Sequence, residues 1–364
     1  MQKKIFHTRY EVHPALAVTD RFFVWGYGTW GKGFLQQWEQ EKTGELLGIV
    51  DKNASEQEHA SASLQAPEAL RAASGVTRVV IAIENPYAVQ DIRDTLHAWG
   101  MDAMAVSTMK RVHSLESVSV DDALAECPDP QMIASYRALL QPCSVRGQKL
   151  VRIGRASDGG YVMLDDFRPG SAAYSFGIGT DVSWDQDMAG RGYDVYMYDH
   201  TIERLPEDRP GFHFFRKGIA GTEQPPHLDT LAHYIQQNHQ EGQQHMILKM
   251  DVEGAEWDAL LACPEELLQA FDQIVLELHG MCSNASAQKR LRVLEKLDRT
   301  HAPVHAHANN WGNEYKIDGR WHTDAWEVTY ANRAVYECAP GGDARTELDV
   351  PACPDVPDVV LFES

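Results

Sequence analysis

Short apolar runs alternate with polar, glycine-containing and helix-compatible segments along most of the chain. In the carboxyl-terminal half, the apolar runs typical of buried strands are 172–176, 195–198, 211–215, 245–250, 271–278 and 304–310. The segments between these runs that predict helices are 183–191, 228–238, 255–261 and 287–297. Because strands and helices alternate, the pattern predicts an α/β fold built on a parallel sheet.

Other segments of this half predict strands of a different kind. Residues 150–164 predict a hairpin whose turn is Asp158-Gly159-Gly160. The apolar runs 325–330 and 359–362 predict two further strands near the end of the chain. The segment 324–333 is expected to run antiparallel to its neighbours.

The amino-terminal half repeats the strand–glycine–helix pattern in a smaller form. Its predicted strands are 21–24, 46–50, 77–83 and 102–106, and its predicted helices include 34–38 and 87–99. Gly26, Gly28 and Gly31 form a Gly-x-Gly-x-x-Gly turn before the first helix, and Asp51 follows the next strand. This arrangement matches a dinucleotide fingerprint, in which the acid binds a ribose.

The two halves predict two Rossmann-like domains. We expect an amino-terminal α/β domain over 1–115, a helical connector over 116–144 and a second α/β domain over 145–364. Within the connector, 131–140 is the clearest predicted helix, because Pro128 and Pro130 interrupt the segment before it.

A second glycine turn lies between the strand 172–176 and the helix 183–191. Gly177 and Gly179 allow close approach of a ligand, and Asp199, at the end of the following strand, can accept two hydrogen bonds from a ribose diol. The turn has no third glycine and no basic residue for a pyrophosphate. It therefore favours a ligand with a ribose and no pyrophosphate, such as S-adenosylmethionine, although an ordinary glycine turn would give the same pattern.

Polar residues follow the next two predicted strands. Asp251 and Glu253 follow the strand 245–250, and Glu277 and His279 end the strand 271–278 on one side. Since ligands bind at the carboxyl ends of parallel strands, these side chains are candidates for the site.

Alternating histidines mark one more strand of this half. His305, His307 and Asn309 alternate to one face of the strand 304–310. Two polar rings at this spacing are unusual on a buried strand, so His307 joins the candidate site residues.

Several motifs together resemble one known family. They are 174–200, the segment Leu248–Trp257 (LKMDVEGAEW), 152–154 with 158–162, and 305–310. The chain resembles, over roughly 145–362, the FkbM-type S-adenosylmethionine-dependent methyltransferases, and most closely the branch that includes the animal methyltransferase-like proteins. The resemblance implies a class I methyltransferase domain with a seven-stranded sheet. It also implies O-methylation of a sugar, a glycan or a secondary-metabolite hydroxyl.

The resemblance and the turn give a set of expected site residues. Those expected to hold the cofactor are Gly177, Gly179, Thr180, Asp181, Asp199, His200, Ile219, Asp251 and Glu253. His279 is the preferred general base, with Glu277 or His307 orienting it or the substrate, and with Asp251 beside the reacting atoms. An alternative is a divalent cation, such as Mg²⁺, held by Asp251, Glu277 and His279.

The amino-terminal domain leaves three interpretations open. Similar small domains precede methyltransferase domains of this family, where they resemble nucleotide-sugar recognition units or scaffolds. A scaffold, a bound nucleotide or nucleotide-sugar, and an NAD(P)-dependent oxidoreductase are the alternatives. The last lacks a Tyr-x-x-x-Lys pair or another evident proton relay.

Net charge and cysteine spacing limit the classes of binding partner and the expected cellular compartment. A formal net charge of −20 disfavours nucleic acid and anionic membranes as partners. The six cysteines form no C-x-x-C pair, which argues against a structural zinc site. Their irregular spacing favours a reducing compartment. With no signal-peptide pattern and no apolar run of about 20 residues, we expect a cytoplasmic protein.

Overall fold

The computed structural model describes residues 3–52, 64–83, 85–101, 105–118, 128–223, 226–317, 320–342, 346–353 and 358–362. The chain divides into two compact units. Unit 1 contains Met1–Leu124, with Asn313–Lys316 and a short segment that begins at Cys353. Unit 2 contains Ala125–Gly312, Ile317–Ala352 and the segment from Asp358.

Unit 1 is built on a parallel sheet with the strand order β6-β5-β2-β3-β4. Its strands are β2 (Arg21–Trp25), β3 (Glu45–Val50), β4 (Leu64–Gln65), β5 (Arg78–Ile81) and β6 (Ala105–Val118). Its helices are α1 (Thr29–Glu41), α2 (Ala69–Ala72) and α3 (Pro86–Ala98). The α/β character predicted for this half is confirmed.

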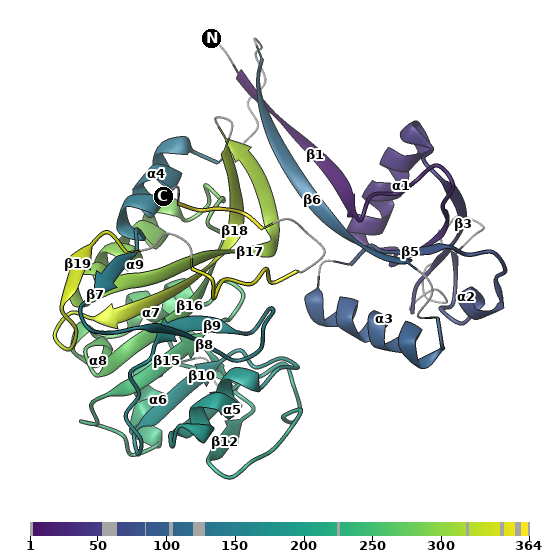
Figure 1. The fold of residues 1–364 in the computed structure, drawn as a ribbon. Coiled ribbons are helices and arrows are strands. Elements are labelled where there is room, and N and C mark those ends of the chain that lie inside the picture. Colours follow the sequence, from purple (N-terminus) through teal and green to yellow (C-terminus); the bar gives the residue numbers. More distant parts are fainter. Residues whose placement is uncertain are drawn as a thin grey trace. The chain divides into compact units, whose positions relative to one another are not determined.

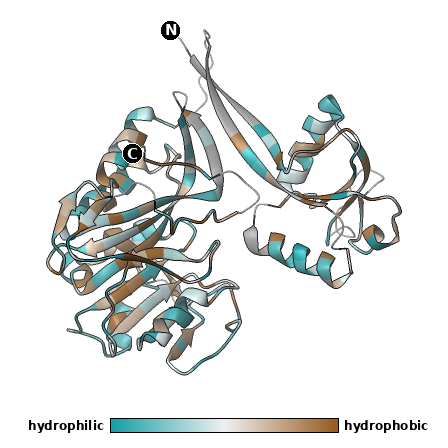
Figure 2. Cartoon of the chain, viewed as in Figure 1, coloured by the Kyte–Doolittle hydropathy of each residue, from teal (hydrophilic) through white to brown (hydrophobic). Residues whose placement is uncertain are grey.

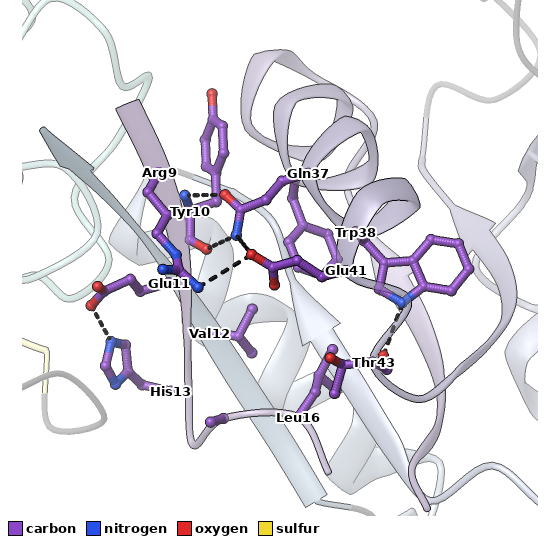
Figure 3. A pocket seen from close by; sticks show the side chains of 12 residues that line it. Arg9, Tyr10, Glu11, Val12, His13, Leu16, Gln37, Trp38, Glu41 and Thr43 are labelled. Atoms are coloured by element: carbon purple, nitrogen blue, oxygen red, sulfur yellow. Dashed lines mark hydrogen bonds and ion pairs between the residues drawn. The ribbon is translucent and has the colours of Figure 1, made fainter. Parts of the chain in front are cut away.

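An additional strand, β1 (Lys3–His13), was not expected from the sequence. It pairs antiparallel with β6 over its whole length (Figure 1). On α1, the Gln37 side chain accepts a hydrogen bond from Tyr10 N at 2.9 Å and donates one to Tyr10 O at 3.1 Å (Figure 3). A side-chain amide thus makes the hydrogen bonds that a neighbouring strand would make at this point of β1. No local sequence pattern predicts that role.

The core of unit 1 lies between its sheet and α1. Phe22 and Val24 of β2 are fully buried there, and they pack with Trp30 and Phe34 of α1. The intervening residues of β2, Phe23 and Trp25, are also buried, so this strand is covered on both faces.

The sheet of unit 2 has the order β12-β11-β10-β15-β16-β18-β17 (Figure 1). The strands are β10 (Ala172–Phe176), β11 (Asp194–Tyr198), β12 (Phe212–Phe215), β15 (Met246–Met250), β16 (Phe271–His279), β17 (His301–Ile317) and β18 (Arg320–Asn332). β10, β11, β12, β15 and β16 are parallel, and β18 is antiparallel to β16. The antiparallel strand predicted near 324–333 is confirmed.

Side chains of the central strands alternate between two cores in unit 2. On one face, Tyr174, Leu248 and Ile274 pack with four helices, namely α4 (Pro130–Leu139), α6 (Leu231–Gln237), α7 (Glu256–Ala262) and α9 (Ala287–Thr300). On the other face, Ala173 and Ile247 pack with α5 (Ser183–Gly190) and the hairpin. The central strands are buried on both sides, which is why their sequences are mostly apolar (Figure 2).

The remaining elements of unit 2 are short. They are β7 (Cys143–Val145), β8 (Leu150–Ile153), β9 (Tyr161–Leu164), β13 (Gly218–Ile219), β14 (Leu228–Asp229), β19 (Cys338–Pro340) and α8 (Glu265–Leu268). β8 and β9 pair antiparallel, so the predicted hairpin is confirmed.

Three predicted elements differ from the observed ones. Val359–Phe362 is not a strand. The helix predicted over 228–238 begins only at Leu231, because Thr230 caps it by accepting a bond from His233 N. Of the strand predicted over 102–106, Ala105 and Val106 begin the much longer β6, and 102–104 lie outside the described residues. Most of the connector before Pro128 lies outside the described residues.

None of the helices in the described part of the chain is long and apolar enough to cross a membrane.

Candidate functional site

The glycine turn after β10 is closed by the neighbouring strand. Gly177 has φ +78°, and a Cβ at this position would lie 1.6 Å from the backbone oxygen of Asp251. Lys249, on the buried strand β15, donates from Nζ to the Gly177 carbonyl at 2.7 Å. Glycine is therefore required here because β10 and β15 approach each other. The sequence predicted that a ligand approaches the chain at Gly177. The backbone of Asp251 lies there instead.

Asp199 lies directly after β11, where it was expected, but its carboxylate is engaged by the protein. Oδ2 accepts hydrogen bonds from the backbone N–H groups of Ile178 and Gly179, both at 2.9 Å. Oδ1 accepts from Thr201 N at 2.7 Å and from Thr201 Oγ1 at 2.6 Å. Burial alone would raise the pKa of Asp199, but these bonds outweigh it and hold the pKa below its ordinary value. The carboxylate thus fixes the glycine turn.

A ribose diol would have to compete for Asp199. A carboxylate has about four acceptor positions, and four bonds fill them. Thr201 is exposed, so its hydroxyl can turn to water and release one position on Oδ1. Asp199 as a ribose ligand remains a prediction, and it requires that exchange.

The other residues of the turn have separate surroundings. Thr180 and His200 are exposed. Asp181 accepts from Ser183 N and Ser183 Oγ, and it lies 3.5 Å from Arg155 Nε of the hairpin turn. Asp181 therefore ties the glycine turn to the hairpin.

A cavity of about 630 Å³ lies beside the segment that follows β13. It is lined by Ile219, Ala220, Gly221, Thr222, Leu228, Ala255, Asp258, Leu261 and Ala262. The lining is mostly apolar and combines the loop after β13 with α7. A cavity of this size and character suits a flat heterocycle such as adenine. Of the residues expected to bind the cofactor, only Ile219 lines it.

At the carboxyl ends of β15 and β16, acidic side chains surround the imidazole of His279. Its Nε2 lies 3.5 Å from Glu277 Oε1, 3.6 Å from Glu253 Oε2 and 4.0 Å from Asp251 Oδ1. The structure therefore brings together four residues that the sequence selected from two strands.

Glu256 is a member of this cluster that sequence reasoning did not select. It is fully buried, and its Oε1 lies 3.4 Å from His279 Nδ1. The same carboxylate accepts bonds from Gly254 N and His279 N, both at 2.8 Å. Glu256 thus holds the loop after β15 to the end of β16. The available signal was its position at the start of α7, three residues after Glu253.

The surrounding charges determine which side chains of the cluster carry a proton. Burial would lower the pKa of His279, but Glu256, Glu277 and Asp251 outweigh it and raise the pKa well above 6.5. Burial, and then the charge of Asp251, raise the pKa of Glu277 well above its ordinary value. At neutral pH the imidazole therefore carries a proton, and it must lose that proton before it can act as a general base.

Three buried carboxylates continue the cluster towards β18. Glu277 and Glu327 are direct cross-strand neighbours, and Asp158 comes from the hairpin turn. Asn309 donates to Glu277 Oε1 at 3.0 Å and to Asp158 Oδ1 at 3.3 Å. Burial first, and then Asp251, raise the pKa of Asp158 to about 7. Like charges opposite each other destabilise a sheet, so this arrangement is typical of a functional site.

His307 belongs to the periphery of this group. Its Nε2 lies 3.1 Å from Asp358 Oδ1, and its Nδ1 lies 3.5 Å from Glu327 Oε2. It is thus paired with Glu327 and Asp358, whereas the predicted role was to orient His279 or the substrate.

Two groupings of these ligand-type side chains could hold a cation. Asp251, Glu253 and His279 form one, and Asp158, Glu277 and Glu327 form the other. The trio expected from the sequence, Asp251, Glu277 and His279, is divided between them.

Comparison with known proteins gives structural neighbours only. No family model and no curated protein matches the chain. The methyltransferase FkbM from Methylobacillus flagellatus KT aligns with a TM-score of 0.35 and 11% identity, over 86% of this chain and 90% of that chain. A SAM-dependent methyltransferase from Agrobacterium tumefaciens aligns with a TM-score of 0.27 and 11% identity, over 61% of this chain and 84% of that chain. The function is therefore inferred from this chain's own residues.

Proposed function

We propose that unit 2 is an S-adenosylmethionine-dependent methyltransferase of the FkbM type. The observation that carries the proposal is the arrangement at one edge of the sheet. The cavity beside Ile219 and the cluster around His279 both lie after the carboxyl ends of strands, where α/β folds bind ligands. The glycine turn between β10 and α5, fixed by Asp199, lies at the same edge.

S-adenosylmethionine supplies a methyl group on a positively charged sulfur, which an oxygen nucleophile can attack. In the proposal, Asp199 Oδ1 accepts a hydrogen bond from the ribose once Thr201 has released that oxygen. The apolar wall formed by Ile219, Ala220 and Leu261 takes the adenine. The acidic edge beyond Asp251 favours a positively charged group nearby.

The proposed role of the His279 cluster is to remove the proton of the acceptor hydroxyl. Because its resting imidazole is protonated, His279 becomes a base only after its proton passes to a carboxylate or to solvent. Asp251, whose side chain is also partly accessible, is the second candidate for this role.

The charge of the cluster also bears on the acceptor. Side chains of Asp251, Glu253 and Glu277 crowd the edge of the sheet, so an anionic acceptor would be repelled. Neutral polyhydroxyl compounds bring hydrogen-bond donors that carboxylates accept. We therefore propose O-methylation of a neutral sugar or glycan hydroxyl, or of another neutral alcohol.

A divalent cation in this cluster is a second proposal for the same chemistry. It would bind beside Asp251 and take the place of protons on Glu277 and His279, and it would lower the pKa of an acceptor hydroxyl. Titration with Mn²⁺ followed by electron paramagnetic resonance tests it. Mn²⁺ binding that is lost in Glu277→Gln would support the proposed cation site. A spectrum of free Mn²⁺ alone would refute it.

The oxidoreductase alternative is not favoured. It would use the glycine turn of unit 1, and the chain offers no evident proton relay for hydride transfer.

Calorimetric titration of the full chain with S-adenosylmethionine and S-adenosylhomocysteine tests the methyltransferase proposal. We expect binding of both, weakened about tenfold or more in Asp199→Asn. Thr201→Val keeps the backbone bond to Asp199 but removes the competing hydroxyl, so it should bind as well as or better than the unchanged chain. Absence of heat with either compound would refute the cofactor assignment.

A further inference from the structure

Unit 1 contains a cavity that the proposed methyl transfer does not use. Its volume is about 510 Å³, which is within the range of small-molecule sites. It is lined by Trp25, Gly26, Gly28, Thr29, Trp30, Asp51, Lys52, Pro67, Glu68, Ala82, Ile83, Ala88, Asp91, Ile92, Thr95 and Trp99. These residues lie at or after the carboxyl ends of β2, β3, β4 and β5, on α1, and on or directly after α3. The cavity therefore lies where a parallel α/β sheet binds its ligand.

Two of the three glycines in the turn after β2 have a reason within the fold. Gly26 has φ +111°, and a Cβ there would lie 2.8 Å from the Ala82 carbonyl oxygen. A Cβ on Gly31 would lie 2.0 Å from the Gly26 carbonyl oxygen, because α1 packs closely on the turn. Side chains are therefore excluded at both positions by the protein itself.

Gly28 has no such reason. Its φ of −73° is open to any residue, and no atom of the described residues lies within 4 Å of a Cβ built on it. It is exposed and lines the cavity at the amino end of α1. A glycine that neither the backbone nor the packing requires is explained if a ligand approaches the chain at this point.

The amino end of α1 is suited to an anionic group. The first turn carries no acidic residue, and no side chain among the described residues caps it. Its backbone N–H groups are therefore available to a phosphate oxygen. Trp30, which is 4% exposed, also lines the cavity, and its Nε1–H has no acceptor within the described residues.

Asp51 follows β3 at the mouth of the same cavity. Its Oδ2 accepts a hydrogen bond from Tyr27 N at 2.8 Å, which fixes the glycine turn against β3. Asp51 is half-buried, and its carboxylate is at the position from which a ribose diol is bound in such folds.

The lining favours one kind of base and disfavours a phosphorylated ribose. Asp51, Glu68 and Asp91 contribute carboxylates, and Lys52 is the one lysine or arginine among the lining residues. Carboxylates accept hydrogen bonds, so they select the amino group of adenine over the carbonyl-rich edge of uracil. The carboxylate of Asp51, which would bind the ribose, would repel a phosphate on the ribose 2′-hydroxyl. Apolar walls for the base come from Ala82, Ile92 and the stacked rings of Trp25 and Trp99.

We propose that this cavity binds the adenosine 5′-diphosphate moiety of a nucleotide. The diphosphate lies against Gly28 and the amino end of α1, the ribose diol is bound by Asp51, and adenine lies between the carboxylates and the apolar walls. The site is separate from the proposed methyltransferase site and does not depend on it.

The test is calorimetric titration of the full chain with ADP-ribose, alongside UDP-glucose and ADP-ribose 2′-phosphate. ADP-ribose is expected to bind at least tenfold more tightly than either comparison compound. Gly28→Val should weaken ADP-ribose binding tenfold or more with only a small change in the melting temperature, since the added Cβ meets no atom of the described residues. Asp51→Asn, which keeps an acceptor for Tyr27 N, should weaken it several-fold.

Gly190→Val in unit 2 is the matched control. Gly190 also has no atom within 4 Å of an added Cβ and no positive φ, so its substitution should leave ADP-ribose binding unchanged. The proposal is overturned if ADP-ribose gives no heat at millimolar concentration, if UDP-glucose binds more tightly, or if Gly28→Val binds ADP-ribose normally. S-adenosylmethionine binding, measured in the same preparations, reports on unit 2 alone and keeps the two proposals distinguishable.

Discussion

Glu256 shows at the scale of one residue how the cluster around His279 is organised. A fully buried carboxylate is costly unless it is bonded or paired. Glu256 meets both conditions through the N–H groups of Gly254 and His279 and through the imidazole of His279. The same contacts keep a proton on that imidazole, so one side chain sets both the position and the charge of the proposed base.

The first prediction concerns the charge of His279. In Glu256→Gln the carboxylate is lost while a side-chain acceptor is kept, so the pKa of His279 should fall. Titration of the His279 ring by nuclear magnetic resonance should show a midpoint at least one pH unit lower in the variant. Glu253→Gln, whose carboxylate is largely exposed, is the control and should shift the midpoint much less. Equal shifts in both variants would contradict the assignment to Glu256.

At the scale of an element, two of the three buried histidines on β17, His301 and His307, have opposite properties. His301 is fully buried between Thr300 Oγ1 and the Phe271 carbonyl oxygen, and burial lowers its pKa to about 4. Burial would also lower the pKa of His307, but Asp358 and Glu327 outweigh it and raise the pKa to about 10. One strand thus holds a neutral ring and a charged ring six positions apart.

The second prediction follows from these two pKa values. His301 has a lower pKa in the folded chain than in the unfolded chain, so the free energy of unfolding should fall as the pH drops from about 6.5 to 4. His307 has a raised pKa, so its contribution should be complete below about pH 6.5 and lost as the pH rises towards 10. Each slope is at most about 1.4 kcal/mol per pH unit.

Urea unfolding over this pH range measures both slopes. His307→Gln should flatten the alkaline slope and leave the acid slope, whereas His301→Gln should do the reverse. If each variant changes both slopes equally, the two rings do not titrate separately.

At the scale of the whole molecule, the chain has two units with separate cores. Phe22 and Phe34 belong to the core of unit 1, and Tyr174 and Leu248 belong to a core of unit 2. Each unit also has its own candidate ligand cavity. Because cooperative unfolding follows from a shared core, we expect the units to respond to ligands individually.

The third prediction is that calorimetry resolves two thermal transitions. A ligand at about 100 times its dissociation constant stabilises the unit that binds it by about 2.7 kcal/mol, which corresponds to roughly 5 °C or more. S-adenosylhomocysteine should raise one transition and ADP-ribose the other. In Asp51→Asn only the ADP-ribose shift should shrink. A single transition that both ligands raise equally would contradict the expected independence.

The sequence determined the elements whose chemistry is local. The apolar runs of β10, β15 and β16, the glycine turns and the antiparallel β18 follow from residue patterns, because strands buried on both faces must be apolar. The sequence also selected Asp251, Glu277 and His279, since polar residues directly after parallel strands meet at one edge.

Only the tertiary structure decided which groups satisfy one another. Asp199 was expected to be open to a ribose, yet Ile178, Gly179 and Thr201 already bond to it. Glu256 joined the site, and β1 joined the sheet of unit 1, through contacts between residues distant in sequence. A hydrogen bond or an ion pair depends on where the partner lies in space, and the residue pattern of one segment does not predict that position.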